Sequence, residues 1–535
     1  MRQLLAILVV ALILPAAADA QKSCDALSSL KLEKTTITSA EVVAAGSFTP
    51  PAGHEDFPGA SGYEHIPAFC RVRADIQPSK DSNIKVEVWM PTSGWNGKYQ
   101  GQGNGGFAGA IDYAALASAV SRGYASAATD TGHAGTPTDA TWALGHPEKI
   151  IDFGYRGIHE MSDKAKAVIA AFYGKAPQHS YFASCSDGGR EALMEAQRFP
   201  DDYDGIVAGA PANFWTHLLA GAAWDNQALL SDPASYIPPA KLPAISAAAI
   251  ASCDARDGLA DEIISDPAHC HFDPAQLQCK GSESDSCLTE PQVTALKKIY
   301  AGAQTVGGSQ IFPGFMPGGE LGGGGWAPWI TGPAPGKSLL FAFGTHFFAH
   351  MIFYDANWDF HKFKLEEDTK LADKKMAPIL NATDPDLRPF QKRGGKLIMY
   401  HGWSDAAIST VNSIQYYDSV VKKMGSGTSD FMRLFMAPGL QHCFMGPGPN
   451  SFGQVQLGPH GDPERDVLSA VERWVESGVA PQRIIATKYV NDLDPSQGVK
   501  MTRPLCPYPQ VAAYNGTGDK NDAASFVCAD KATSH

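Results

Sequence analysis

Residues 181–190 (YFASCSDGGR) constrain the fold more than any other part of the chain. A β-prone run leads into this stretch, a tight turn is predicted at residues 184–187, and a helix-forming segment follows at 191–199. A strand, a sharp turn and a helix in this order lift one serine out at the edge of a sheet, and here that serine is Ser186. Gly188 and Gly189 let the helix pack close to the strand. A plain Ser-Gly turn is the alternative, because Ser184 stands where such an elbow usually has glycine.

Two further residues are candidates for the partners that a serine nucleophile requires. Asp405 follows the largely apolar run 396–399, and His442 follows the run 432–436, so each is predicted to lie on a loop directly after a strand. The chain order Ser186, Asp405, His442 is that of the α/β-hydrolases. In such a set the histidine takes the serine proton, and the aspartate orients and stabilises the imidazole. The pattern predicts a Ser-His-Asp catalytic triad.

The surroundings of these residues resemble a known family. Cys185 precedes the serine, Cys443 follows the histidine, and the neighbouring segments 190–200 (REALMEAQRFP) and 204–211 (DGIVAGAP) fit the same pattern. The constellation resembles the tannase and feruloyl esterase family, whose signature is a Cys-Ser-x-Gly-Gly elbow with a distant His-Cys. The resemblance covers nearly the whole mature chain. It implies an α/β fold with an α/β-hydrolase core, and a disulfide between Cys185 and Cys443 that ties the nucleophile loop to the base loop.

Ten cysteines, an even number, are typical of a protein that folds in an oxidising compartment. The sequence alone leaves their pairing open, with buried free thiols as the alternative. The resemblance implies four local pairs besides the one already named: Cys24 with Cys70, Cys253 with Cys270, Cys279 with Cys287, and Cys506 with Cys528.

The first twenty residues have the features of a secretory signal peptide. A charged start precedes the apolar run 4–14, and small residues at 18–20 offer a cleavage site near Ala20. The apolar run is too short to span a bilayer, so residues 1–20 are predicted to be removed. The protein is then expected to be secreted or periplasmic, without a membrane partner. A net charge of −13 without a basic tract argues against a nucleic-acid partner.

The predicted architecture is an α/β-hydrolase core interrupted by a large inserted lid domain. Strand and helix patterns alternate through residues 21–212 and again through 385–535, which are predicted to form the catalytic domain in two parts. Residues 213–384 are rich in Ala, Gly and Pro, and are too long for a loop in a compact domain. Their glycine-rich run 318–325 is predicted to be a mobile lid loop. Their aromatic residues are either lid core or a wall for an aromatic substrate.

A second glycine-rich segment, residues 102–109, is the candidate for binding a reaction oxyanion. It comes after residues 84–90, whose alternating pattern predicts a strand with one buried face. In hydrolases of this class a backbone N–H from such a turn helps to bind the oxyanion. Gly105 or Gly106 is therefore predicted as one donor, and the N–H of Asp187 as the other. A simple flexible loop is the alternative.

An acidic loop at residues 253–263 is the candidate metal site. Asp254, Asp257 and Asp261 surround a glycine at spacings that can wrap a hard cation, although the loop is not an EF-hand. A solvated acidic turn is the alternative. The resemblance implies a structural Ca²⁺ that stabilises the lid, bound by these side chains and by the backbone oxygens of Leu259 and Ile263. The chain lacks a dinucleotide fingerprint, so no organic cofactor is predicted. It also lacks the Cys/His spacing of a zinc site.

Together these features predict a secreted serine carboxylesterase that forms an acyl-enzyme. The resemblance implies esters of aromatic acids as substrates, either small molecules or plant polymers: feruloyl and other hydroxycinnamoyl esters first, galloyl esters second. One member of the family hydrolyses the terephthalate monoester released from polyester. It carries an aromatic residue three positions after its triad aspartate, where this chain has Ile408. The non-enzyme alternative is a calcium-stabilised polysaccharide-binding protein, which the complete Ser, Asp and His set disfavours.

Overall fold

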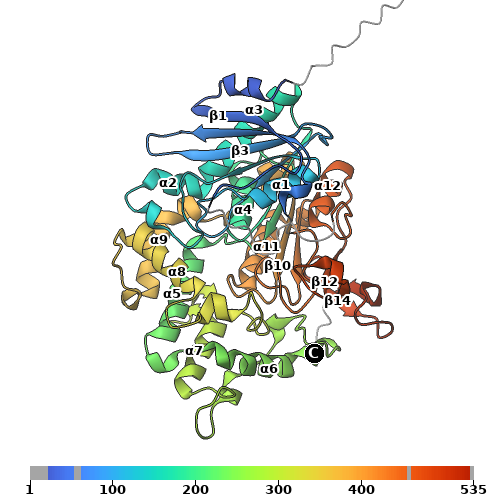
Figure 1. Cartoon of the computed structure of the whole chain (residues 1–535). Helices are drawn as coiled ribbons and strands as arrows, with labels where there is room; N and C mark the ends of the chain where they lie inside the picture. The colour runs from blue at the N-terminus through green and yellow to red at the C-terminus, as the bar shows by residue number, and fades with distance from the viewer. Residues whose placement is uncertain (1–21, 53–61, 455–459, 531–535) are drawn as a thin grey trace, which may run out of the picture.

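The computed structural model describes residues 22–52, 62–454 and 460–530 (Figure 1). The predicted signal peptide, residues 1–20, lies outside the described residues. Within the described ranges, no helix is both long enough and apolar enough to cross a membrane.

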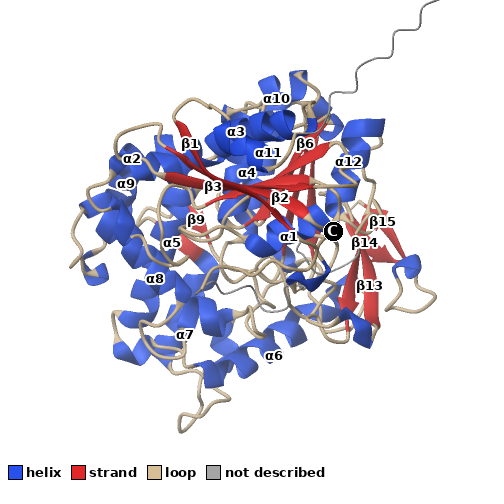
Figure 2. Cartoon of the chain, turned by 45° about the horizontal axis from the view of Figure 1, so that its top comes forward, coloured by secondary structure: helices blue, strands red, loops and turns tan. Residues whose placement is uncertain are grey.

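A large, mostly parallel sheet forms the centre of the molecule, with helices on both sides (Figures 1 and 2). Along the sheet, each of the first four strands pairs antiparallel with the next of the four. All neighbours from the fourth strand onward pair parallel. This sheet confirms the predicted α/β fold class. In the described part of the chain nine strands lie side by side, in the order β1 (Thr35–Val43), β2 (Phe69–Ile76), β3 (Ile84–Pro91), β5 (Ala125–Thr129), β4 (Lys98–Gln102), β6 (His179–Cys185), β7 (Gly205–Gly209), β10 (Lys396–Gly402) and β11 (Met432–Ala437).

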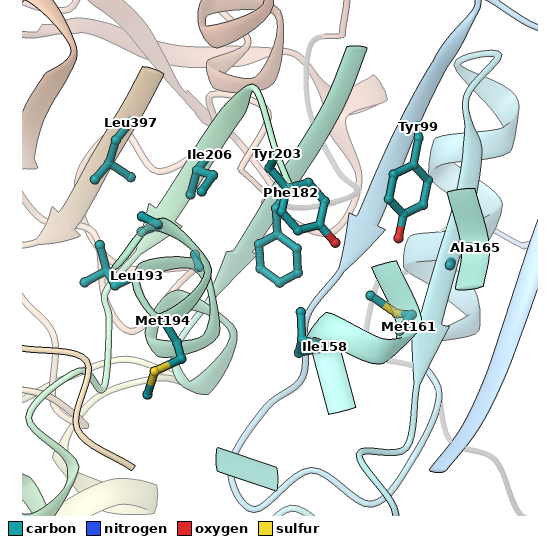
Figure 3. Packing of buried hydrophobic residues seen from close by; sticks show 14 of the residues in the cluster. Tyr99, Ile158, Met161, Ala165, Phe182, Leu193, Met194, Tyr203, Ile206 and Leu397 are labelled. Atoms are coloured by element: carbon teal, nitrogen blue, oxygen red, sulfur yellow. The ribbon is translucent and has the colours of Figure 1, made fainter. Parts of the chain in front are cut away.

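Successive residues of the central strands point to opposite faces of the sheet, and both faces are covered. Phe182 of β6 packs into a core that includes Leu193 and Met194 (Figure 3), whereas its neighbour Tyr181 packs with Trp474. Strands buried on both faces have near-continuous apolar runs, which explains the composition of β10 and β11. The first face carries α3 (Gly157–Tyr173), α4 (Asp187–Arg198), α10 (Arg388–Lys392) and α11 (Thr410–Met424), and the second carries α1 (Tyr113–Ser121) and α12 (Val467–Ser477).

Strand β3 departs from the prediction of one buried face. Glu87, whose polar side chain suggested a solvent-facing position, is only 3% exposed. Its carboxylate accepts hydrogen bonds from Arg71 Nε at 2.8 Å and from Trp89 Nε1 at 2.9 Å. The second face of β3 is therefore buried as well, because an ion pair and an indole N–H compensate the charge. A polar residue in an alternating pattern does not by itself mark the face that water reaches.

Residues 213–384 form a mainly helical region on one side of the sheet, seen in green and yellow in Figure 1. Its central helix, α5 (Trp215–Leu230), packs against three others. The region contributes two apolar clusters that also include side chains from the sheet-bearing part of the chain. Its other elements are α6 (Leu242–Cys253), α7 (Glu290–Ala301), α8 (Leu339–His346), α9 (Leu365–Leu380) and the paired strands β8 (Gly302–Gln304) and β9 (Gln310–Pro313).

Smaller elements complete the described fold. They are α2 (Pro147–Ile151), which precedes α3, and two antiparallel strand pairs near the C-terminus, β12 (Ile484–Tyr489) with β13 (Val499–Leu505) and β14 (Val511–Tyr514) with β15 (Phe526–Ala529).

Candidate active site

Ser186 occupies the sharp turn between β6 and α4. Its backbone has φ 67° and ψ −123°, a conformation that residues other than glycine rarely adopt. The Ser186 N–H donates to the Gly209 carbonyl at 3.0 Å, and the Ser186 carbonyl accepts from the Ala212 N–H at 3.1 Å. These two bonds fix the turn to the end of β7 and hold the strained residue in place. The structure therefore has the elbow geometry that the sequence predicts.

Ser184 fits at the position where an elbow usually has glycine because its neighbours lack side chains. A Cβ on Gly188 would lie 1.9 Å from Ser184 Oγ, and one on Gly103 would lie 2.8 Å from the same oxygen. A Cβ on Gly189 would lie 2.2 Å from the Gly209 carbonyl oxygen. Room for the Ser184 side chain thus comes from Gly188 and Gly103, while Gly189 allows α4 to approach β7.

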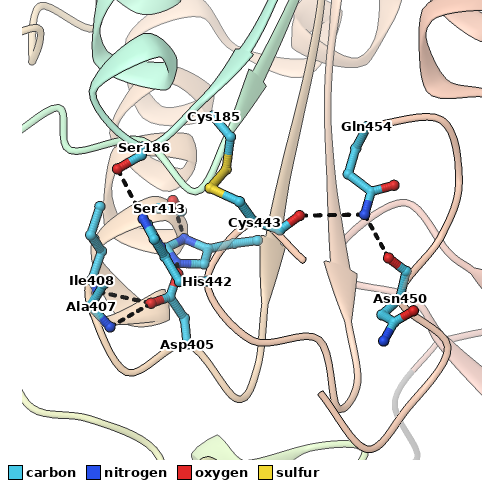
Figure 4. Close-up of a disulfide and its surroundings, with 11 residues drawn as sticks. Cys185, Ser186, Asp405, Ala407, Ile408, Ser413, His442, Cys443, Asn450 and Gln454 are labelled. Atoms are coloured by element: carbon cyan, nitrogen blue, oxygen red, sulfur yellow. Dashed lines mark hydrogen bonds and ion pairs between the residues drawn. A yellow bond between two sulfur atoms is a disulfide. The ribbon is translucent and has the colours of Figure 1, made fainter. Parts of the chain in front are cut away.

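The three predicted triad residues meet at the carboxyl edge of the parallel strands (Figure 4). Ser186 Oγ lies 2.9 Å from His442 Nε2, and His442 Nδ1 lies 2.8 Å from Asp405 Oδ2. Ser186 follows β6, Asp405 follows β10 and His442 follows β11, so parallel strands bring together residues that are far apart in sequence. With the imidazole proton on Nδ1, Nε2 is free to accept the serine hydroxyl proton.

Asp405 is a buried carboxylate that stays charged. Burial disfavours the charge, but His442 and His401 hold the pKa of the Asp405 carboxyl well below its usual range. The other carboxylate oxygen, Oδ1, accepts from the backbone N–H groups of Ala407 at 2.7 Å and Ile408 at 2.9 Å (Figure 4). A fixed negative charge beside His442 is what a general base of this kind requires.

His401 is a residue of the site that the sequence analysis missed. Its Nε2 lies 3.0 Å from Asp405 Oδ2, the same oxygen that His442 contacts. The available signal was its position at the end of β10, four residues before Asp405. Because periodicity predicts only a buried strand there, the side-chain contact required the structure.

The five cysteine pairs that the family resemblance implied are all disulfides in the structure. Cys185 and Cys443 bridge the loop of Ser186 to the loop of His442, with a Cα–Cα distance of 6.0 Å (Figure 4). The carbonyl of Cys443 accepts a hydrogen bond from Gln454 Nε2 at 3.4 Å. The other four are Cys24–Cys70, Cys253–Cys270, Cys279–Cys287 and Cys506–Cys528.

The loop with Gly105 and Gly106 lies against the elbow helix. The Gly188 N–H donates to the Asn104 carbonyl at 2.8 Å, and the Asn104 N–H donates to Glu191 Oε2 at 2.8 Å. Neither Gly105 nor Gly106 donates its N–H to another residue that the structure describes. Burial raises the pKa of the Glu191 carboxyl to about 8. The loop is thus fixed beside Ser186, and the roles of Gly105, Gly106 and Asp187 as oxyanion donors stay a prediction.

Aromatic side chains from residues 213–384 extend to the catalytic histidine candidate. The half-buried Trp329 ring, in the short π-helical turn Ala327–Thr331, stands edge-on to His442 with 5.0 Å between ring centroids. Trp329 stacks with Phe343, which in turn contacts Phe107 beside the glycine loop. Trp326, by contrast, is fully buried core. Trp326 is therefore core of this region, as one interpretation predicts. The other, a wall for an aromatic substrate, stays a prediction for Trp329.

The glycine-rich run 318–325 is docked on the loops that carry Asp405 and His442. The Gly318 carbonyl accepts from Ser404 Oγ at 3.1 Å, and the Gly324 N–H donates to Gln441 Oε1 at 3.0 Å. A Cβ on Gly319 would lie 2.6 Å from the Ser404 carbonyl oxygen, so glycine allows the close approach. This segment attaches residues 213–384 to the site, which the prediction of a mobile loop did not anticipate.

The acidic loop predicted to bind calcium lies at the end of α6. The carboxylate of Asp254 accepts from the backbone N–H groups of Asp261 at 3.3 Å and Glu262 at 3.1 Å. Burial, together with the nearby charges of Asp261 and Asp254, raises the pKa of the Asp257 carboxyl. Three crowded carboxylates on one short loop suit the oxygen donor set of a hard cation.

An ion pair between Arg503 and Asp261 restricts how a cation could bind this acidic loop. Arg503 Nη2 binds Asp261 Oδ2 at 2.9 Å, and both side chains are only 3% exposed. A cation would therefore share Asp261 with Arg503 or bind its other oxygen. The proposed backbone ligands, Leu259 and Ile263, use their N–H groups to bind the carboxylates of Asp257 and Asp261. The donor chemistry fits Ca²⁺, and the ligand set stays a prediction.

A different cluster brings possible metal ligands closest together among the described residues. Ligand atoms of His159, Glu195 and Asp202 lie within 4.8 Å of one another. His159 Nδ1 is 2.6 Å from Asp202 Oδ2, and Lys166 Nζ is 3.7 Å from Asp202 Oδ1. Because these cationic groups already balance the charge of Asp202, the cluster is explained without a metal ion.

Comparison with known proteins assigns the family. The sequence model described as tannase and feruloyl esterase matches residues 70–529. An uncharacterised esterase of Xanthomonas campestris is 43% identical over 96% of this chain and 92% of its own length. The mono(2-hydroxyethyl) terephthalate hydrolase of Piscinibacter sakaiensis is 34% identical over 88% of this chain and 86% of its own. The crystal structure of feruloyl esterase B from Aspergillus oryzae matches with a TM-score of 0.86 at 30% identity, covering 95% of this chain and 99% of that one. This chain therefore belongs to the tannase and feruloyl esterase family and is a carboxylic ester hydrolase.

Proposed function

We propose that the protein is a secreted serine esterase that hydrolyses esters of aromatic acids through an acyl-enzyme on Ser186. The observation that carries this proposal is the continuous hydrogen-bonded chain from Ser186 through His442 to Asp405. Support comes from the distance between Ser186 Oγ and His442 Nε2, which puts the proposed base within hydrogen-bond reach of the proposed nucleophile.

In the proposed reaction Ser186 Oγ attacks the ester carbonyl while His442 Nε2 takes the hydroxyl proton. His442 then gives that proton to the leaving alcohol oxygen, and the C–O bond of the ester breaks. A water molecule, deprotonated by the same Nε2, then attacks the acyl carbonyl. The bond between the acyl carbon and Ser186 Oγ breaks, His442 returns the proton to Oγ, and the aromatic acid leaves. The charged Asp405 stabilises the imidazolium that forms in each half of the reaction.

The oxyanion of the tetrahedral intermediate would be bound by backbone N–H groups. The N–H of Asp187, at the start of α4, and that of Gly105 or Gly106 are the proposed donors. Each such donor stabilises the transition state by about 3 kcal/mol in comparable enzymes. Support comes from the bonds that hold the glycine loop on α4 through Asn104.

An aromatic acyl group is the proposed specificity. Trp329 stands beside His442 and stacks with the half-buried Phe343, so these two rings are the proposed contacts for an aromatic acid. Phe107, which contacts Phe343, is fully buried and supports them as core. We place feruloyl and other hydroxycinnamoyl esters first and galloyl esters second, in line with the feruloyl esterase B neighbour. The similarity to the mono(2-hydroxyethyl) terephthalate hydrolase makes its substrate the third candidate. Ile408, where the terephthalate monoester hydrolase of the family is expected to have an aromatic residue, is only 3% exposed and belongs to the apolar cluster that includes Phe107.

Substitution of the nucleophile tests the reaction and a substrate panel tests the specificity. Ser186→Ala is expected to abolish hydrolysis of methyl ferulate, methyl gallate and the terephthalate monoester while the circular dichroism spectrum stays unchanged. Wild-type protein is expected to give its highest kcat/KM with methyl ferulate. Activity of Ser186→Ala close to that of the wild type would remove Ser186 from the mechanism. Binding of plant polysaccharide without turnover of any of the three esters would favour the non-enzyme alternative.

Export is proposed from the N-terminal sequence and from the disulfides. Five disulfides within the described residues are typical of proteins that fold in an oxidising compartment. Expression of the full chain in a bacterial host, followed by N-terminal sequencing of the exported protein, is expected to give a start near Gln21. Retention of residues 1–20 on active protein inside the cell would contradict this proposal.

Calcium is proposed as a structural ion at Asp254, Asp257 and Asp261. Bound Ca²⁺ would stabilise the folded state by mass action, so Tm is expected to rise with calcium concentration. Chelation should lower Tm more than it lowers kcat at moderate temperature, since the loop is distant from Ser186 in sequence. The Asp257→Asn variant is expected to lose this calcium dependence. An unchanged Tm on transfer from excess calcium to excess chelator would contradict the site.

A further inference from the structure

The Asp405 carboxylate has two imidazole partners on a single oxygen. Oδ2 lies 2.8 Å from His442 Nδ1 and 3.0 Å from His401 Nε2. His401 is fully buried at the end of β10, so water does not compete for this contact. Together with the N–H groups of Ala407 and Ile408 on Oδ1, the carboxylate has four hydrogen-bond donors.

A serine on α11 is the partner of the other nitrogen of the second imidazole. Ser413 Oγ lies 2.7 Å from His401 Nδ1, and Ser413 is fully buried. For His401 to donate to Asp405, its proton must be on Nε2, which leaves Nδ1 to accept from the Ser413 hydroxyl. The interactions then form one chain, from Ser413 through His401 and Asp405 to His442 and Ser186.

We propose that His401 is a positioning residue for ester hydrolysis. Its hydrogen bond keeps Asp405 Oδ2 at the position where it binds His442 Nδ1. This inference rests on the proposed function of the Ser186, His442 and Asp405 set. His401 has a second effect through its hydrogen bond: a carboxylate with a fourth donor has less negative charge available for the protonated His442. His401 thus sets both the direction of the Asp405 carboxylate and the strength with which it stabilises the imidazolium.

Tyr400, the neighbour of His401 on β10, is a further titratable group whose pKa Asp405 affects. Its side chain belongs to the core on the α12 face of the sheet. Burial, together with the charge of Asp405, raises the pKa of the Tyr400 hydroxyl, so it stays protonated and neutral. Asp405 and His442 are therefore the charged groups that can respond to a change at His401.

The decisive comparison is between His401→Leu and His401→Gln. Leucine removes the donor, whereas the amide N–H of glutamine can occupy the place of Nε2. For His401→Leu we expect kcat to fall by about tenfold, since a misplacement of about 1 Å can cost a hundredfold, with KM nearly unchanged. The acid limb of its kcat/KM profile should move to higher pH, because Asp405 then stabilises the protonated base more strongly. His401→Gln should keep the wild-type acid limb and most of kcat.

Ser413→Ala gives an independent variant that leaves His401 in place. Loss of the hydroxyl frees the imidazole to carry its proton on Nδ1, which turns a lone pair toward Asp405. We expect a shift of the acid limb in the same direction as in His401→Leu, and a smaller one. A purely structural role of His401 would lower Tm in these variants without moving the pH profile.

A measurement on the unmodified protein covers the case in which a variant fails to fold. With ¹⁵N-histidine labelling and residue assignment, exchange-protected imidazole N–H resonances are expected from both His442 and His401, besides those of other buried histidines such as His133. The comparison concerns the first two. Only the His442 resonance should change across the acid limb of the activity profile. Absence of a protected His401 resonance, or a folded His401→Leu with wild-type kcat and pH profile, would overturn the inference. If Ser186→Ala remained active, the proposed function would fail instead, whatever the result at His401.

Discussion

The buried carboxylates around the elbow differ in the hydrogen-bond donors that they meet, and burial competes with those donors in setting each pKa. Asp405, with four donors, stays charged. Asp187 is paired with Arg190 at 2.5 Å, yet burial raises its pKa to about 6. Glu195 on α4 is 1% exposed, and neither of its oxygens meets a donor among the described residues. Burial and the neighbouring Asp202 raise the pKa of the Glu195 carboxyl well above its usual value, which favours the protonated acid in the folded protein.

The raised pKa of the Glu195 carboxyl predicts how the stability of the folded protein depends on pH. The unfolded chain loses the Glu195 proton near pH 4.3, whereas the folded protein retains it to higher pH. As pH rises above the unfolded pKa, Glu195 therefore lowers the free energy of unfolding. Glutamine mimics the protonated acid without titrating. We expect Glu195→Gln to raise Tm relative to the wild type, with a larger difference at pH 8 than at pH 5.

The exposed Glu33 offers a matched control for this measurement. Glu33→Gln should change Tm by a similar small amount at both pH values. Differential scanning calorimetry of the three proteins across pH 5 to 8 gives the comparison. A Glu195→Gln advantage that is equal at both ends of this range, or that shrinks toward pH 8, would show that Glu195 is charged in the folded state.

The glycine-rich run 318–325 joins the inserted region to the base and acid loops. Its contacts are with Ser404 and Gln441, the residues immediately before Asp405 and His442. Any displacement of this segment is therefore transmitted to the two loops that position the triad. Trp329, which stands beside His442, lies a few residues further along the same part of the chain. The segment is thus placed to couple the insertion to catalysis.

Alanine substitution of two glycines in this run tests that coupling. A Cβ on Gly319 would lie 2.6 Å from the Ser404 carbonyl oxygen, so the backbone must shift. A Cβ on Gly323 would have only the flexible Met445 Sδ at 3.3 Å. We expect Gly319→Ala to lower kcat about tenfold or more, because displacements of about 1 Å at a catalytic group are costly. Gly323→Ala should keep wild-type kcat, and equal effects in steady-state assays of the two variants would contradict the coupling.

The elements that follow the sheet pattern were predictable, and contacts between distant segments were not. Runs 396–399 and 432–436 predict strands because both faces of a parallel strand need apolar residues, and the structure has β10 and β11 there. The positions of Asp405 and His442 follow from those strand ends. His401 and Trp329 carry no local signal of their contacts, since one lies within a strand and the other among many apolar aromatic residues. Their roles depend on tertiary packing that periodicity does not encode.

At the scale of the whole molecule, the Cys185–Cys443 disulfide links the two parts of the sheet-bearing chain that residues 213–384 separate in sequence. Cys185 and Cys443 are 258 positions apart, and residues 213–384 lie between them. In the chain-entropy model, closing a loop of this length stabilises the folded state by about 5 kcal/mol. The bond also limits how far His442 can move from Ser186, because each cysteine is the chain neighbour of one of these residues. Stability and catalytic geometry are therefore linked through the same bridge.

The double variant Cys185→Ala/Cys443→Ala is expected to lower both Tm and kcat. Its control is Cys279→Ala/Cys287→Ala, which removes a bridge that spans only 8 positions within the insertion. In the chain-entropy model the short loop contributes about half as much stability, so this control should lower Tm less. It should leave kcat unchanged at temperatures where both proteins are folded, because it does not constrain His442. A roughly tenfold or greater loss of kcat confined to the first variant would support a geometric role for the long bridge, since small misplacements of the base are costly. Equal kcat values in two folded variants would show that packing alone positions His442.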